Sequence, residues 1–143
     1  MTATDTILLV EDNDDDVFFF QHAWTSAGVP NPLRVVRDGQ QAVSYLEGSG
    51  EFADRQKFPL PTLILLDLKL PFRNGHEVLS WIRAHPLVRK CLVVFLTSSR
   101  ENTDVRKAYE LGTNGYLAKP ASAAQLTEMV RAVRAYWLDL NVS

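Results

Sequence analysis

The chain has 143 residues, of which 46% are hydrophobic and 22% charged, and these are ordinary values for one globular domain. Its net charge of −2 offers nucleic acid no electrostatic attraction, and its single cysteine excludes an intramolecular disulfide. No apolar run approaches the roughly 20 residues that span a bilayer, and the N-terminus lacks the basic and apolar segments of a secretory signal. We therefore expect one cytoplasmic domain over residues 1–143, with no output domain and with neither nucleic acid nor a membrane as partner.

Short apolar runs alternate with amphipathic stretches along the chain. The runs predict strands near residues 6–11, 33–37, 62–67, 92–97 and 114–118. The stretches between them predict helices near residues 14–27, 39–47, 75–84, 101–111 and 122–139. Runs that are apolar throughout are typical of strands buried on both faces, and their alternation with helices is typical of parallel sheets. The predicted fold class is therefore α/β, a doubly wound five-stranded parallel sheet with five helices.

The first and last predicted helices each have an apolar face that should pack on the sheet. The residues of these two faces recur at helical spacing: Val17, Phe20, Trp24, Ala27, Leu126, Met129, Val130, Val133, Trp137 and Leu140. Phe19 lies opposite the face of its helix, while Tyr136 and Leu138 lie outside theirs, so all three are expected to be at least partly exposed. An exposed aromatic side chain suggests a docking surface, although single surface aromatics are also ordinary.

Two apolar runs end directly in acidic residues. The run 7–10 is followed by Glu11 and Asp12, and the run 63–66 is followed by Asp67. Ligands of such open sheets bind at the carboxyl ends of the strands, so these three carboxylates should meet at one edge. Two unit charges about 4 Å apart repel by about 4 kcal/mol at an effective dielectric of 20, so the cluster needs a cation, a shared proton or a lysine. Carboxylate oxygens are ligands that Mg²⁺ prefers.

Two further strand ends carry residues that suit a phosphoryl group. The run 92–96 ends in Thr97, and the run 115–118 ends in Lys119. A single threonine at a strand end is usually a turn residue, and a single lysine is usually solvated. Next to the acids, however, Lys119 could neutralise charge on a transferring phosphoryl group and Thr97 could donate to one of its oxygens.

These residues together resemble the receiver domain of response regulators in two-component signalling, over roughly residues 5–140. The resemblance is carried by Glu11, Asp12, Asp67, Thr97, Tyr116 and Lys119 followed by Pro120. Their spacing matches the family pattern, with 30 residues from Asp67 to Thr97, 19 more to Tyr116 and three more to Lys119. The resemblance implies a flavodoxin-like sheet with the strand order 2-1-3-4-5.

The resemblance also implies a mechanism. Asp67 would accept a phosphoryl group from a sensor histidine kinase, while Asp12, Asp67 and the main-chain carbonyl of Lys69 would ligate Mg²⁺ and Glu11 would act through water. Thr97 and Lys119 would bind the phosphoryl oxygens. The protein would be a switch that catalyses its own phosphorylation and dephosphorylation rather than an enzyme with a separate substrate. Lys69 departs from the more usual asparagine, which affects the expected rate of dephosphorylation.

Within the family, the chain resembles single-domain regulators that are paired with phytochrome histidine kinases. The resemblance implies that Thr97 and Tyr116 switch together and reshape the surface of the fourth helix, fifth strand and fifth helix. It implies a homodimer through that same surface, to which Tyr136 and Leu138 would contribute. It also places Phe19 against the kinase.

Two alternatives from other functional classes remain. A phosphohydrolase of the haloacid-dehalogenase type would need a second acid two residues after the nucleophile, where this chain has Lys69. A protein-interaction module that is never phosphorylated would have no need to keep acids that are costly to bury together.

Overall fold

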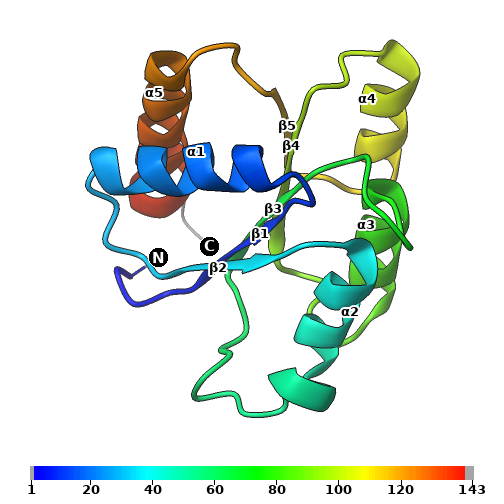
Figure 1. The fold of residues 1–143 in the computed structure, drawn as a ribbon. Helices are drawn as coiled ribbons and strands as arrows, with labels where there is room; N and C mark the ends of the chain where they lie inside the picture. The colour runs from blue at the N-terminus through cyan, green and yellow to red at the C-terminus, as the bar shows by residue number, and fades with distance from the viewer. Residues whose placement is uncertain (1, 141–143) are drawn as a thin grey trace.

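The computed structural model describes residues 2–140, which form a parallel five-stranded sheet with the order β2-β1-β3-β4-β5 (Figure 1). The strands are β1 (Ile7–Val10), β2 (Leu33–Val36), β3 (Leu63–Leu66), β4 (Leu92–Thr97) and β5 (Gly115–Ala118). The helices are α1 (Asp14–Ser26), α2 (Gly39–Glu47), α3 (Gly75–Ala84), α4 (Asn102–Glu110) and α5 (Ala123–Val133). The predicted fold class and strand order are confirmed. No helix within residues 2–140 has the length and apolar character needed to cross a bilayer.

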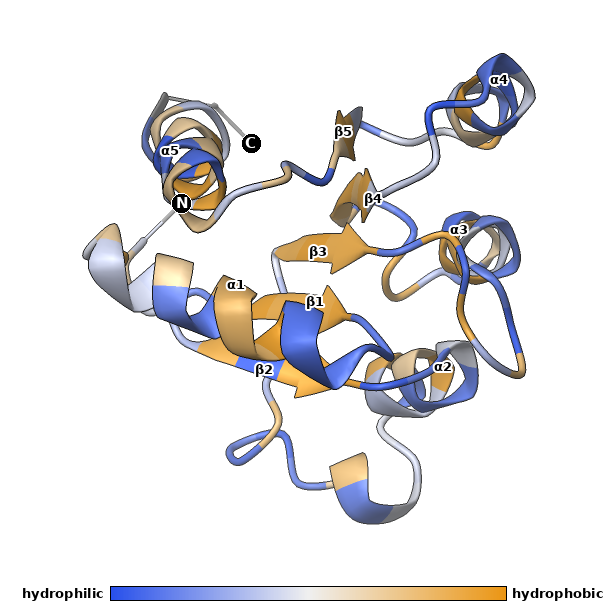
Figure 2. Cartoon of the chain, turned by 45° about the horizontal axis from the view of Figure 1, so that its top comes forward, coloured by the Kyte–Doolittle hydropathy of each residue, from blue (hydrophilic) through white to orange (hydrophobic). Residues whose placement is uncertain are grey.

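The sheet is buried on both faces because helices cover both sides. Helices α1 and α5 lie on one side, and α2, α3 and α4 lie on the other (Figure 1). Every side chain of the central strands β1 and β3 is buried, and both strands are hydrophobic along their length (Figure 2). Alternate residues of each strand therefore point into two separate cores.

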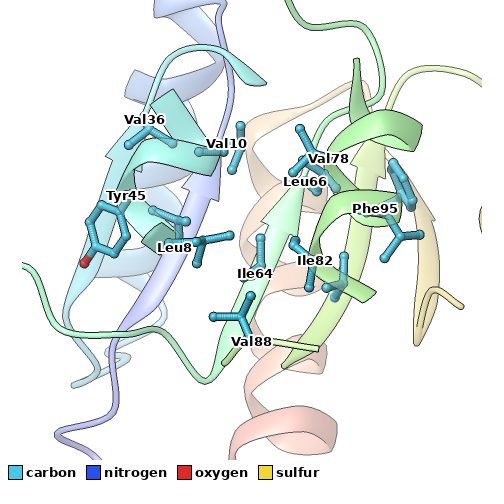
Figure 3. Packing of buried hydrophobic residues seen from close by; sticks show 14 of the residues in the cluster. Leu8, Val10, Val36, Tyr45, Ile64, Leu66, Val78, Ile82, Val88 and Phe95 are labelled. Carbon is cyan, nitrogen blue, oxygen red and sulfur yellow. The ribbon is translucent and has the colours of Figure 1, made fainter. Parts of the chain in front are cut away.

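The two cores divide the strand residues between them. Leu8, Val10 and Ile64 face α2 and α3, and they pack there against side chains such as Ile82 (Figure 3). Ile7 and the other strand residues that alternate with this first set face α1 and α5. Complete burial of one such aliphatic side chain stabilises the fold by about 1.5–3 kcal/mol, so the two layers together hold the strand ends in fixed positions.

The long connection between α2 and β3 is ordered by specific contacts. It contains a short 3-10 helix, η1 (Gly50–Phe52), whose Phe52 packs against Tyr45 of α2. The Arg55 guanidinium donates to the carbonyl oxygens of Tyr45 and Leu46, at 2.7 and 2.8 Å, and to that of Phe58 at 3.2 Å. The segment therefore covers the edge of the core at the end of α2.

The C-terminal helix departs from the predicted one and corrects one expectation. Instead of an α-helix to residue 139, α5 gives way to a wider helix of the π type, η2 (Arg134–Leu140). The prediction that Leu138 is exposed was wrong, because its side chain is only 4% exposed and packs in the core beside Val133. Hydrogen bonds in a π-helix join residues five apart, so its wider turn brings Leu138 nearer to the side of Val133 than an α-helix would. Tyr136 is 58% exposed, as predicted. The side chain of Leu140 lies outside the described part.

Candidate functional site

The backbone hydrogen bonds of the sheet continue into the residues that follow the strands. The N–H of Glu11 donates to the Val36 carbonyl at 3.1 Å, and the N–H of Asp67 donates to the Val10 carbonyl at 3.1 Å. Likewise, the N–H of Lys119 donates to the Thr97 carbonyl at 2.9 Å. The predicted site residues are therefore held by the sheet itself, at one edge.

The three predicted acids form a cluster. One oxygen of each of Glu11, Asp12 and Asp67 lies within 4.8 Å of the other two. Glu11 and Asp67 are buried, whereas Asp12 is exposed to water. Buried carboxylates with one side open to solvent fit Mg²⁺, which typically keeps several waters and takes one or two carboxylates. Lys69 lies two residues after Asp67 in the turn before α3, and its side chain is exposed. This is compatible with the prediction, in which only its main-chain carbonyl would contact the cation.

Lys119 lies against this cluster, as the sequence predicted. Its ammonium group donates to Glu11, to Asp67 Oδ2 at 3.2 Å and to Asp16 Oδ2 at 2.9 Å. Burial raises the pKa of Glu11 to about 7, against the opposing effect of the hydrogen bond from Lys119. Burial by itself would lower the pKa of Lys119, but its hydrogen bonds to Glu11 and Asp16 outweigh this and raise it. The lysine thus remains charged beside the acids.

Asp16 also belongs to this site, although it was not among the residues predicted from the sequence. Asp16 lies in the first turn of α1, where an acid ordinarily interacts with the helix dipole. The side chain instead reaches across to Lys119, which is 103 residues away in the chain. The available signal was that an unusually acidic first turn directly follows the acidic end of β1.

The Asp67 carboxylate is positioned by the turn that follows it. Its Oδ1 accepts the N–H of Leu68 at 2.8 Å, while its Oδ2 accepts from Lys119. The N–H of Gly75 donates to the Leu68 carbonyl at 2.7 Å and closes this turn against the start of α3. A Cβ atom at position 75 would collide with the Asp67 carbonyl oxygen and lie 2.7 Å from the Phe95 ring. The backbone can pass there only as glycine.

Thr97 and Tyr116 meet through the loop after β4. Thr97 is buried, and its Oγ1 accepts the N–H of Ser99 at 3.4 Å. The Tyr116 hydroxyl donates to the Ser99 carbonyl at 3.0 Å, and its ring lies 5.5 Å from that of Phe95. Tyr116 is half-buried in this arrangement. A movement of Thr97 would therefore reach Tyr116 through one short loop.

Of the three residues predicted to contact a partner, Phe19 and Tyr136 are exposed and Leu138 is buried. Phe19 is 50% exposed and lines a cavity of about 370 Å³, together with Lys119 and Ser122, between α1 and the start of α5. Tyr136 is exposed on η2, whereas Leu138 is buried and offers nothing to a partner. An exposed aromatic residue thus borders the acid and lysine site, on the side of α1.

The sequence model of the response regulator receiver domain matches residues 7–131. The chain belongs to this family. It is 38% identical over 133 residues to the response regulator Rcp1 of Synechocystis, covering 93% of this chain and 88% of that protein. It is 40% identical over 140 residues to the probable methanogenesis regulatory protein FilR2 of Methanothrix harundinacea, covering 96% and 86%.

Solved structures of receiver domains have the same fold. The phosphorylated cyanobacterial phytochrome response regulator RcpA has a TM-score of 0.89 and 37% identity, with 97% of each chain covered. The Mn²⁺-bound form of Rcp1 has a TM-score of 0.86 and 37% identity, with 96% of this chain and 97% of that one covered. RPA3017, described in red-light signalling of R. palustris, has a TM-score of 0.91 and 34% identity, with 96% of each chain covered.

Membership in this family makes the protein a signalling switch that takes a divalent cation as cofactor. The predicted cofactor class is thereby confirmed, and the acidic cluster supplies carboxylate oxygens of the kind that such an ion requires. The haloacid-dehalogenase alternative loses its support, because the family match is to receiver domains and the residue two positions after Asp67 is Lys69.

Proposed function

We propose that the chain is a phosphoacceptor response regulator in which Asp67 takes a phosphoryl group from a sensor histidine kinase. The observation that carries the proposal is the convergence of Glu11, Asp12 and Asp67 within 4.8 Å, with Lys119 bonded to two of them. A site with two buried carboxylates, Glu11 and Asp67, and a single lysine is costly to fold. Such a cost is understandable where the charges bind a cation and a phosphoryl group.

In the proposed reaction a carboxylate oxygen of Asp67 attacks phosphorus, the bond from phosphorus to the donor imidazole breaks, and the imidazole takes up a proton. Lys119 and the hydroxyl of Thr97 bind the phosphoryl oxygens, where charge spreads in the loose transition state. Asp12, Asp67, the carbonyl of Lys69 and, through water, Glu11 would hold Mg²⁺, which would supply positive charge that offsets repulsion between the acids and the phosphate. The protein thus catalyses its own phosphorylation, and in the proposed dephosphorylation water attacks the same phosphorus, phosphate leaves and the Asp67 carboxylate is restored.

The proposed response to phosphorylation runs from Thr97 to Tyr116. Because the Tyr116 hydroxyl is bonded to the Ser99 carbonyl, a shift of Thr97 toward the phosphoryl group would move the partner of Tyr116. The surface that changes is that of α4, β5 and α5. Two arrangements of this loop, biased by new charge-assisted contacts, are sufficient for a switch.

The proposed kinase is of the phytochrome type and binds near Phe19. The support is similarity to proteins described as phytochrome or red-light response regulators, at 34–37% identity over nearly the whole chain. The relatives Rcp1 and FilR2 are matched over 88% and 86% of their own length, which supports a function shared with whole response regulators. Neither nucleic acid nor a membrane is a proposed partner.

Phosphotransfer profiling tests the proposed kinase. Autophosphorylated sensor kinases of the host would be mixed with the purified protein and Mg²⁺ for short times. We expect one kinase, of the phytochrome type, to transfer its label much faster than the others, because specificity appears as a difference in rate between competing partners. Fast transfer only from an unrelated sensor would reject the phytochrome assignment while leaving the phosphoacceptor function in place.

The proposed homodimer uses the surface of α4, β5 and α5, now without Leu138. Tyr136 on η2 and Tyr109 on α4 are 58% and 53% exposed and are aromatic anchors of the kind that dominate interfaces. We expect Tyr136→Ala to weaken dimerisation by roughly tenfold or more, measured by light scattering over a concentration series. Phe72→Ala, at an 85% exposed residue of the turn before α3, is the control and should leave the dimer unchanged. Equal dimerisation of all three proteins would reject this surface.

A further inference from the structure

Lys119 has one partner that belongs neither to the acidic cluster nor to the phosphoryl acceptor. A lysine ammonium has three N–H donors, and here they meet Glu11, Asp67 and Asp16. Glu11 and Asp67 are members of the candidate metal cluster, and Asp16 is not. Asp16 Oδ2 is 2.9 Å from the nitrogen, closer than the 3.2 Å of Asp67 Oδ2. Lys119 is therefore also held by a carboxylate that lies outside the candidate metal cluster.

The backbone of Asp16 is held by the N-cap of α1, while its side chain is 45% exposed. Asn13 is the N-cap of α1, and its side chain accepts the N–H of Asp16 at 2.9 Å. The N–H of Asn13 in turn donates to Glu11 Oε2 at 3.2 Å. One short segment thus places the Glu11 and Asp16 carboxylates on the same ammonium. The Lys119 side chain is only 19% exposed, so a lost partner would not be replaced fully by water.

The other two partners of Lys119 change during the proposed reaction. A divalent cation at the cluster would interact with the Glu11 carboxylate and compete with Lys119 for it. The Asp67 carboxylate would become an acyl phosphate with a different charge distribution. Asp16 lies outside the cluster and is not the phosphoryl acceptor, so neither event alters its carboxylate directly. We infer that Asp16 is a positioning residue, which holds the Lys119 ammonium beside Asp67 before, during and after phosphoryl transfer. This inference depends on the proposed phosphoacceptor function.

The experiment compares Asp16→Ala and Asp16→Asn with the native protein. The measurement is the rate of phosphorylation by acetyl phosphate at saturating Mg²⁺, followed by intact-protein mass. We expect Asp16→Ala to slow phosphorylation about tenfold, since a hydrogen bond to a charged group is lost. Asp16→Asn should restore most of the rate, because its amide oxygen still accepts from Lys119. The affinity for Mg²⁺, measured by calorimetry, should change by less than about threefold, because Asp16 lies outside the cluster.

Asp15→Ala is the matched control. Asp15 lies in the same first turn with an exposed side chain, so this variant removes an equal charge from the same helix end. This variant should be phosphorylated by acetyl phosphate at the native rate. An equal loss in Asp15→Ala would show a general charge effect and overturn the inference.

Three other outcomes would also overturn it. A native or faster rate in Asp16→Ala would mean that Asp16 competes for Lys119 instead of holding it. An equal loss in Asp16→Asn and Asp16→Ala would mean that charge, and not the hydrogen bond, matters. A large loss of Mg²⁺ affinity in Asp16→Ala would make Asp16 part of the metal site. If the native protein itself gains no phosphoryl group, the proposed function fails instead.

Discussion

Asp67→Asn is expected to abolish the gain of one phosphoryl group that the native protein shows with acetyl phosphate and Mg²⁺. The amide has nearly the shape of the carboxylate, so the backbone bonds of the turn remain possible, but its oxygen cannot form an acyl phosphate as the carboxylate does. Intact-protein mass measured over time is the readout. A chelator added to the native protein should give the same loss, because the cation offsets the repulsion between the acids and the phosphoryl group.

Asp54→Asn is the control for this experiment. Asp54 is exposed in the connection after η1, so its variant makes the same chemical change away from the site and should be phosphorylated at the native rate. Retention of the mass gain in Asp67→Asn would reject Asp67 as the acceptor. A native protein that gains no mass, with or without Mg²⁺, would favour an interaction module that is never phosphorylated.

Gly75→Ala is expected to lower the free energy of unfolding by about 3 kcal/mol, as overpacking at a site without free space does. The added Cβ would meet the Asp67 carbonyl oxygen, lie 2.7 Å from the Phe95 ring and lie 2.9 Å from Leu68 Cα. Two of these neighbours are backbone atoms, so no change of side-chain rotamer relieves the collision. Urea unfolding followed by circular dichroism measures the change.

Gly115→Ala is the matched control for the loss of stability. A Cβ there would lie 3.4 Å from the Trp137 ring and 3.5 Å from the nearest Val94 atom, which are ordinary contacts. We expect a change below about 1 kcal/mol for this variant. The folded Gly75→Ala protein should also accept a phosphoryl group more slowly, because the turn that carries Asp67 must shift to make room for the added Cβ. Native stability in Gly75→Ala would show that the turn is not closely packed.

Most of the site could be predicted from the sequence because parallel strands end at a common edge. Glu11, Asp67 and Lys119 each follow an apolar run directly, so alternation of strands and helices was enough to bring them together. The identity of the acids then pointed to a divalent cation. Their spacing in the chain carried the family resemblance.

The sequence by itself therefore determined the fold class and the set of polar residues that meet at the strand ends. Only the tertiary structure decided the partners that come from helices: the pairing of Asp16 with Lys119, and the burial of Leu138. The end of a parallel strand always lies at the same edge of the sheet, so the residue that follows it has a predictable place. A helix can turn any of its sides toward the sheet, and its packing decides which side that is. One change from α to π spacing near Arg134 was sufficient to turn Leu138 inward.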